Sequence, residues 1–212
     1  MPVVRKAGTV LALTGLLLVI PTARASAEWQ FAPFVGYTFK GSTTLVDLED
    51  ATAERHWNFG GAVTLLGEGP VGLEGYFVYT PGFFQREGGG FVGGGDVISS
   101  YSYTMMGNAV LTTPRRWNQY GLRPYVSGGV GLLRVSAKDQ FNVTPIRLNL
   151  LGMNVGGGAV GFLNDRVGLR FDLRYFRKIQ GPDVETLEIP VSRGEPIRLR
   201  YWTTAIGVVI KY

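Results

Sequence analysis

The side chain best suited to acid–base chemistry is His56, the only histidine in the sequence. Asp50, Glu54 and Asn58 lie nearby in the chain, and an imidazole can act as general base for a hydroxyl nucleophile within hydrogen-bond reach. Trp57 and Asn58 follow the histidine, so no His-x-Ser motif is present. We therefore expect His56 to be a residue at the rim of the fold and predict no catalytic site.

Metal and phosphate sites are not indicated either. The sequence has no cysteine and one histidine, so it lacks the ligand clusters that hold metal ions, and we expect no metal site and no cofactor. Two strings, at 88–93 and 156–161, match G-x-G-x-x-G, but neither precedes a helical pattern whose N-terminus could hold a phosphate. We expect the first to be a loop tip, and Gly156, Gly158 and Gly161 to mark crowded or bent strand positions.

Five further charged residues occupy polar positions in segments that alternate between polar and apolar side chains: Glu74, Arg123, Arg170, Asp172 and Arg174. If those segments are strands closed into a narrow barrel, the five side chains share its interior. An unpaired ion there costs several kcal/mol, so the acids and bases must pair. The pattern favours a salt-bridge network that fills the interior, with a gated ion path as the alternative.

The elements that position these residues follow an N-terminal segment with the three parts of a secretory signal. Arg5 and Lys6 precede an uncharged, mostly apolar stretch at 8–20 and an Ala-Ser-Ala cleavage pattern at 25–27. The apolar stretch is shorter than the ~20 residues of a membrane-spanning helix. We therefore predict a cleaved signal peptide at 1–27.

The predicted mature chain is close to neutral. Residues 1–27 contain three basic residues and no acid, which leaves 18 basic and 16 acidic residues beyond them. No clustered basic face is evident in the sequence, so we expect no nucleic-acid partner. Glycine is abundant, and charged residues make up 17% of the chain, below the ~25% of ordinary soluble domains. This composition argues against a helical fold.

Beyond residue 27, eight segments alternate between apolar and polar residues and are separated by turn or loop sequences. We predict strands at Glu28–Lys40, His56–Leu66, Pro70–Thr80, Val97–Thr112, Leu122–Ala137, Ile146–Phe162, Arg166–Lys178 and Arg198–Tyr212. Several exceed the ~9–11 residues that a tilted strand needs to cross a membrane. The pattern predicts an all-β fold over 28–212, an eight-stranded antiparallel transmembrane β-barrel with up-and-down meander connectivity.

The charge on each strand face indicates which face is outside. One face is apolar and ends in aromatic residues such as Trp29, Phe31 and Tyr37, while the other, from Gln30 to Lys40 in the first segment, is small or polar with few ions. A water-facing surface would carry more charge, and aromatic girdles are typical of membrane barrels. We therefore expect the apolar face to contact lipid. The reverse assignment would give a soluble, lipocalin-like ligand carrier.

The connections between the predicted strands alternate in length. Three lie at 67–69, 113–121 and 163–165 and are tight or short, and the other four, at 41–55, 81–96, 138–145 and 179–197, are generally longer and polar. In outer-membrane barrels the short turns face the periplasm and the longer loops face outward. We therefore expect four external loops, with both ends of the barrel domain on the short-turn side.

The chain resembles the outer-membrane β-barrel family of the OmpA/OmpX type over nearly all of 28–212. The resemblance rests on glycine-spaced strand sequences at 58–63, 71–74, 107–111 and 123–131 and on an aromatic C-terminus. Tyr212, Ile210 and Val208, spaced by two, resemble the terminal strand that the barrel-insertion machinery recognises in this family, in which most members end in Phe. The resemblance implies an outer-membrane location, without the periplasmic peptidoglycan-binding domain of some relatives.

These observations predict a non-enzymatic integral outer-membrane protein that contributes to envelope integrity or to surface interactions through its four loops. The expected partners are outer-membrane lipid, the insertion machinery during biogenesis and an extracellular ligand at the loops, and the expected state is a monomer. Two alternatives within the membrane stay open. One is a lipid A-modifying barrel enzyme that uses His56, and the other is a narrow channel or carrier for small solutes.

Overall fold

The computed structural model describes residues 28–43, 55–67, 69–83, 97–114, 121–139, 146–180 and 198–212. The predicted signal peptide and most of the four long connections lie outside these residues, so signal cleavage stays a prediction. The described residues form eight strands: β1 (Glu28–Thr43), β2 (His56–Leu66), β3 (Val71–Pro81), β4 (Val97–Thr112), β5 (Leu122–Asp139), β6 (Ile146–Phe162), β7 (Val167–Gln180) and β8 (Leu199–Lys211). Within the same residues, no helix is long and apolar enough to cross a membrane.

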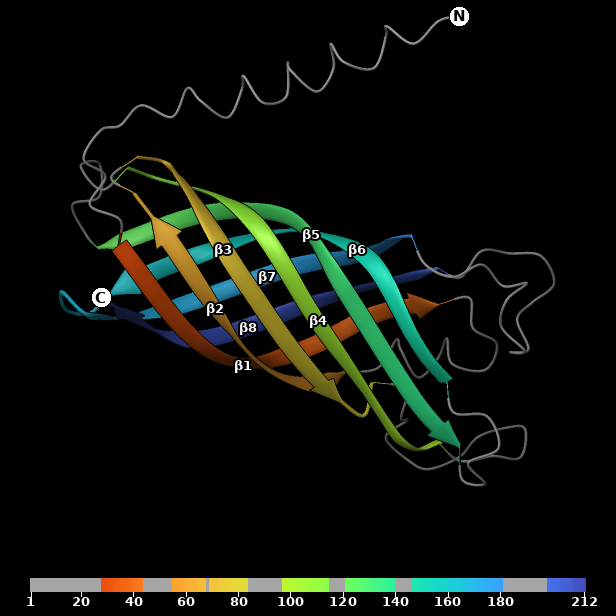
Figure 1. Cartoon of the computed structure of the whole chain (residues 1–212). Coiled ribbons are helices and arrows are strands. Elements are labelled where there is room, and N and C mark those ends of the chain that lie inside the picture. Colours follow the sequence, from red (N-terminus) through yellow and green to blue (C-terminus); the bar gives the residue numbers. More distant parts are fainter. Residues whose placement is uncertain are drawn as a thin grey trace, which may run out of the picture.

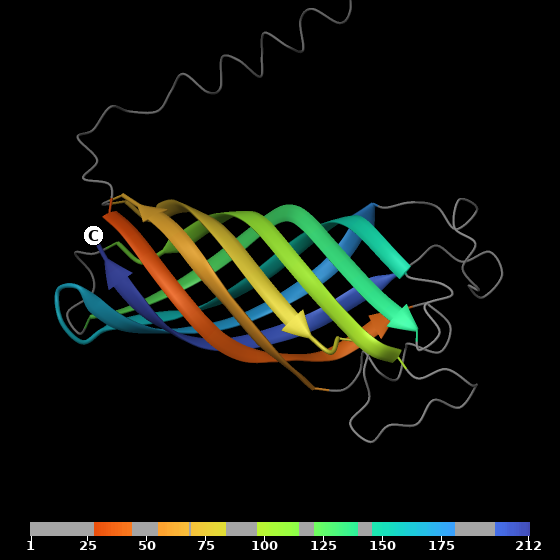
Figure 2. The ribbon, with the colours of Figure 1, turned by 60° about the horizontal axis from the view of Figure 1, so that its bottom comes forward.

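The eight strands close into one barrel. Each pairs with its neighbour in sequence, and β8 pairs antiparallel with β1. Figure 1 shows the strands running obliquely around the barrel, and Figure 2 shows β1 beside β8 at the seam. β1 begins and β8 ends at the same end, where the Tyr212 N–H donates to the Trp29 carbonyl oxygen at 2.9 Å. The predicted eight-stranded antiparallel barrel is confirmed.

The two ends of the barrel differ. The end at which β1 begins and β8 ends also holds the connections β2–β3, β4–β5 and β6–β7, and we call it the short-turn end. The opposite end holds the connections β1–β2, β3–β4, β5–β6 and β7–β8, and we call it the loop end. Three of the four loop-end connections are longer than any at the short-turn end, as expected, but the β5–β6 connection at 140–145 is shorter than the β4–β5 connection at 113–121.

Alternating side chains separate the outer surface from the interior. On β3, Leu73 is 64% exposed whereas its neighbour Glu74 is 3% exposed. The same alternation on β8 exposes Ile206 and buries Ala205. The outer surface is therefore apolar over most of its extent, which is rare in soluble monomers and typical of a surface that contacts lipid. This confirms the expected assignment of the faces and disagrees with the soluble-carrier alternative.

One part of the predicted alternation is wrong, at the end of β1. The register between β1 and β8 shifts between Phe39 and Ser42, and Lys40 has φ 50°, a left-handed value that is uncommon outside glycine. This bulge adds a residue to β1 and reverses its alternation. Lys40, expected on the same face as Thr38, is exposed instead, and Thr43 is buried.

The interior changes character along the barrel axis. Near the short-turn end it holds the buried charges, but near the loop end its side chains are neutral: mostly aliphatic and aromatic on β5–β8, and mostly hydroxyl or amide on β1–β4. The buried loop-end residues include Val78, Phe83, Leu133, Val135, Leu148, Leu150, Phe176 and Leu199. The small, polar inner face expected from the sequence therefore describes β4 but not the loop-end halves of β5 and β6.

Candidate functional site in the barrel interior

Four charged side chains form one cluster inside the barrel, which we call the ionic quartet: Glu74, Arg170, Asp172 and Arg174. Arg170 lies 2.5 Å from Glu74 through Nη2 and 2.6 Å from Asp172 through Nε. Arg174 lies 2.9 Å from Glu74 through Nη1 and 2.6 Å from Asp172 through Nε. All four are buried, and each ion contacts two of opposite sign, so the cluster is electrically balanced.

The quartet joins opposite walls of the barrel. Glu74 belongs to β3, whereas the other three belong to β7, which is four strands away in either direction around the ring. Arg170, Asp172 and Arg174 all point inward because side chains two apart on a strand share a face. The ion pairs from β7 to Glu74 therefore cross the interior.

The two carboxylate oxygens of Glu74 also accept hydrogen bonds from an amide and a hydroxyl group. Asn108 Nδ2 donates to Glu74 Oε1 at 2.8 Å, and Thr64 Oγ1 donates to Oε2 at 3.5 Å. Asn154 Nδ2 in turn donates to Asn108 Oδ1 at 2.6 Å. These contacts extend the polar network from β3 to β2, β4 and β6, so it reaches most of the circumference of the barrel.

Two tyrosines cover the guanidinium groups of the quartet. Arg174 Cζ lies 3.8 Å from the centre of the Tyr76 ring, and Arg170 Cζ lies 4.8 Å from the centre of the Tyr125 ring. A ring face attracts a cation most strongly where water is excluded, as it is around these buried side chains. The tyrosines thus provide favourable contacts for guanidinium surface that faces no carboxylate.

Glycines in β6 make the room that the quartet needs. A Cβ atom on Gly156 would lie 2.6 Å from Arg174 Cγ and 2.8 Å from Arg174 Cα, and one on Gly158 would lie 2.8 Å from the Tyr125 hydroxyl. Both are crowded positions, as expected from the sequence. Gly161 differs, because its Cβ would meet only Leu122 Cδ1 at an ordinary 3.6 Å.

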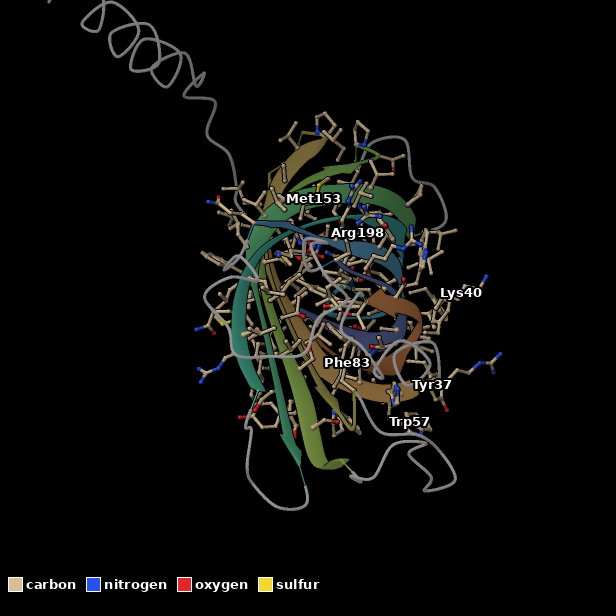
Figure 3. All side chains as sticks on the ribbon, turned by 90° about the vertical axis from the view of Figure 1, so that its right-hand side faces the viewer. Tyr37, Lys40, Trp57, Phe83, Met153 and Arg198 are labelled. Atoms are coloured by element: carbon tan, nitrogen blue, oxygen red, sulfur yellow. The ribbon has the colours of Figure 1, made fainter. Side chains whose placement is uncertain are left out.

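A column of aromatic rings continues from the quartet toward the loop end. Tyr76 and Phe176 have ring centres 6.3 Å apart, Phe176 and Tyr201 5.0 Å apart, and Tyr201 and Phe83 5.3 Å apart. The hydroxyls of Tyr201 on β8 and Thr104 on β4 lie 2.6 Å apart, another contact between opposite walls. Figure 3, which looks into the loop end, shows Phe83 within the ring of strands.

The free space near the quartet is small. A gap toward the short-turn end, lined by Gln30, Arg123 and Tyr125 among others, has a volume of about 20 Å³. That is enough for a water molecule and too little for a solute. Together with the contacts between opposite walls, this describes a filled interior.

Arg123 and His56 lie apart from the quartet. Arg123 is buried in the wall of the small gap, and its Nη2 donates to the Thr113 carbonyl oxygen at 3.5 Å. His56 is buried at the loop end, with its ring centre 6.3 Å from that of Phe83. In the described part of the chain, no three His, Cys, Asp or Glu residues are placed to hold a metal ion.

The three residues predicted to form the insertion signal share the outer face of β8. Val208 and Ile210 are exposed there, and Tyr212 is 93% exposed just beyond the strand. An exposed strip of this kind is accessible to a partner. Its recognition by insertion machinery stays a prediction.

Sequence reasoning missed three aromatic residues of the interior. Tyr76, Tyr125 and Phe176 each stand two positions after a charged residue that was expected inside. The period of two therefore places them on the inner face. They were missed because large aromatic residues were assigned to the lipid-facing surface, where most of the others do lie.

A closed barrel with an apolar outer surface and a filled polar interior is the architecture of an eight-stranded outer-membrane β-barrel protein. Solved structures bear this out. The fold is similar to that of Neisserial surface protein A, with a TM-score of 0.59 and 12% identity over 87% of this chain and 97% of that one. It is also similar to the outer membrane protein OprG from Pseudomonas aeruginosa, with a TM-score of 0.55 and 12% identity over 89% of this chain and 97% of that one.

A third similar structure is that of Ail, the attachment invasion locus protein of Yersinia pestis. The TM-score is 0.50, with 12% identity over 87% of this chain and 99% of that one. No family model matches the chain, and no curated protein matches it. Identities this low establish a shared fold, so the predicted resemblance to outer-membrane barrels is confirmed at that level.

Proposed function

We propose that this chain is a non-enzymatic integral outer-membrane protein. Its filled barrel acts as an anchor, and its loop end acts at the cell surface, in envelope integrity or in binding an external partner. The observation that carries the proposal is the set of contacts joining opposite walls, the quartet between β3 and β7 and the Thr104–Tyr201 contact between β4 and β8. Because side chains meet across the interior at both of these positions, the barrel offers no continuous path for a solute.

The surface role draws support from the asymmetry of the two ends. Long connections at one end of a membrane barrel are typically extracellular, and binding function is commonly carried by loops on a rigid scaffold. Among proteins with this fold, Ail was crystallised with the heparin analogue sucrose octasulfate. An external ligand at the loop end of this chain is the corresponding proposal.

The enzymatic alternative has less support. His56 is buried beside Phe83 at the loop end, whereas a lipid A-modifying base must reach the lipid-facing side of the barrel. A His56→Ala variant is therefore expected to leave the mass spectrum of cellular lipid A unchanged. A changed spectrum in that variant would instead assign a catalytic role to His56.

The anchor proposal is tested by gel mobility and by conductance. Protein from the outer-membrane fraction, run in SDS with and without heating, should change mobility on heating, because closed membrane barrels commonly stay folded in unheated detergent. The same protein in planar bilayers should give no conductance steps. Regular steps from the wild-type chain would contradict the anchor and favour the channel alternative.

A further inference from the structure

Two arginines at the loop end face each other on the outer surface of the barrel. Arg177 on β7 and Arg200 on β8 are register partners, and both side chains are exposed. Like charges directly opposite on neighbouring strands destabilise a sheet unless something compensates them. Neither guanidinium group has a hydrogen bond or ion pair with another side chain that the structure describes.

A third cation lies on the next strand. Lys40 on β1 falls between Phe39, which pairs with Trp202, and Ser42, which pairs with Arg200. The bulge at this point turns Lys40 outward, and Figure 3 shows it projecting from the rim on the side where Tyr37 and Trp57 lie. Lys40, Arg177 and Arg200 thus form a basic sector over β7, β8 and β1.

The depth of the basic sector follows from the aromatic rings beside it. Toward the short-turn end, Tyr175 lies opposite Trp202 with ring centres 5.1 Å apart, and Tyr37 lies 4.1 Å from Trp57. Aromatic girdles of membrane barrels lie at the membrane–water interface. The cations immediately beyond the rings are therefore at the depth of lipid headgroups.

Among the side chains that the structure describes, no acidic group balances this sector. Glu74 and Asp172 are buried in the interior, Glu28 pairs with Lys211 at 2.9 Å, and Asp165 lies in the β6–β7 turn at the short-turn end. The same level of β3 and β4 presents three tyrosines: Tyr79 stacks on Tyr103, and Tyr101 contacts Tyr103 edge to face. Other exposed cations lie at this end, such as Arg55 and Arg134, which is opposite Tyr103, but in the basic sector two of the cations are direct register partners.

We propose that the basic sector binds the phosphate group of a lipid in the outer leaflet, whose acyl chains lie on the apolar surface of β7, β8 and β1. A guanidinium group forms paired, charge-assisted hydrogen bonds with phosphate oxygens, and two adjacent guanidinium groups can share one phosphate. The bound anion supplies the charge that offsets the Arg177–Arg200 repulsion. This inference rests on the proposed membrane residence of the barrel and adds a lipid-binding site to it.

The test measures lipid retention by native mass spectrometry of the full-length mature barrel in neutral detergent. The probes are a bisphosphorylated glucosamine disaccharide lipid (lipid A) and the same lipid without phosphates. An Arg177→Gln/Arg200→Gln variant should bind the phosphorylated probe at least about tenfold more weakly than wild type, because both charge-assisted contacts are lost. An Arg200→Gln single variant should give a smaller loss.

The matched control is Arg134→Gln/Arg166→Gln, which removes the same charge from exposed sites on β5 and in the β6–β7 turn. It should bind within about twofold of wild type, since neither arginine belongs to the basic sector. Equal losses in the two double variants, or equal binding of the two probes by wild type, would overturn the proposal. Displacement of the lipid by an equal concentration of inorganic phosphate would also overturn it.

Heat-dependent gel mobility separates this proposal from the previous one. If all variants keep the mobility shift but bind lipid equally, the lipid site is wrong and the anchor stands. If the wild-type protein shows no mobility shift, the anchor proposal fails, and the lipid site fails with it.

Discussion

The two halves of the barrel interior are held together by different physical interactions. Toward the short-turn end, the ionic quartet contributes directional contacts with a fixed number of partners. Toward the loop end, side chains of β5–β8 such as Leu133, Leu148 and Phe176 contribute close packing, and the hydrogen bonds there join neutral groups. In the charged half, loss of any one ion of the quartet leaves another ion buried without its partner. In the packed half, one apolar side chain can replace another if its volume is similar.

The difference indicates what each half contributes to the fold. A buried salt bridge is weak evidence for net stability, because desolvation offsets much of the attraction. A slip of β7 by one residue, however, would move Arg170, Asp172 and Arg174 to the lipid-facing side, where a charge at the membrane midplane costs about 2–4 kcal/mol for Arg. The quartet thus specifies the register of β7, and the packed half contributes more of the stability.

The largest expected effect is that of breaking the charge balance. Asp172→Asn leaves both guanidinium groups with only Glu74, and we expect it to lower the free energy of unfolding by about 4 kcal/mol. Urea titration of the barrel in detergent or vesicles measures this change. The control Asp165→Asn removes the same charge from the exposed β6–β7 turn and should cost less than about 0.5 kcal/mol. Equal effects of the two substitutions would show that the quartet has no special importance.

The next effect tests the packed half. Leu133→Ala empties a fully buried position and should cost about 3 kcal/mol in the same titration. Leu132→Ala makes the same change one residue away on the outer face and should cost clearly less, because no interior cavity forms. If the outer substitution proved as costly as the inner one, the loop-end interior would not be closely packed.

The smallest of the three effects tests the fit between β6 and the quartet. Gly156→Ala brings a Cβ atom to 2.6 Å from Arg174 Cγ and 2.5 Å from the Leu173 carbonyl oxygen. We expect a cost of about 2 kcal/mol from overpacking. Gly75→Ala is the matched control, since no atom lies within 4 Å of its Cβ position, and a loss as large as that of Gly156→Ala would contradict the close approach.

The sequence predicted the charged half better than the packed half for a physical reason. A charge in an apolar strand marks the inner face by itself, so Arg170, Asp172 and Arg174 fix the orientation of all of β7. Leu132 and Leu133 are chemically identical neighbours, and nothing in their local sequence shows which one is buried. The bulge at Lys40 was missed for a similar reason, because no residue type around it indicates that the strand contains an extra residue there.

The sequence could not show that Glu74 on β3 pairs with Arg170 and Arg174 on β7. Alternation gives the face on which a side chain lies but not its height along the axis, which depends on the stagger between strands. The basic sector was missed in the same way, since Arg177 and Arg200 are brought together only by the register of β7 and β8.

The seam of the barrel joins its first strand, β1, to its last, β8, so the barrel cannot close before β8 is present. The strand that begins at Glu28 finds its second partner only when the stretch ending at Lys211 has been synthesised. Until then two strand edges remain open, and unpaired backbone groups are not tolerated in a lipid interior. The barrel can therefore close only when β8 is available to β1, and the lipid-facing side chains of a chain still in water need protection until then.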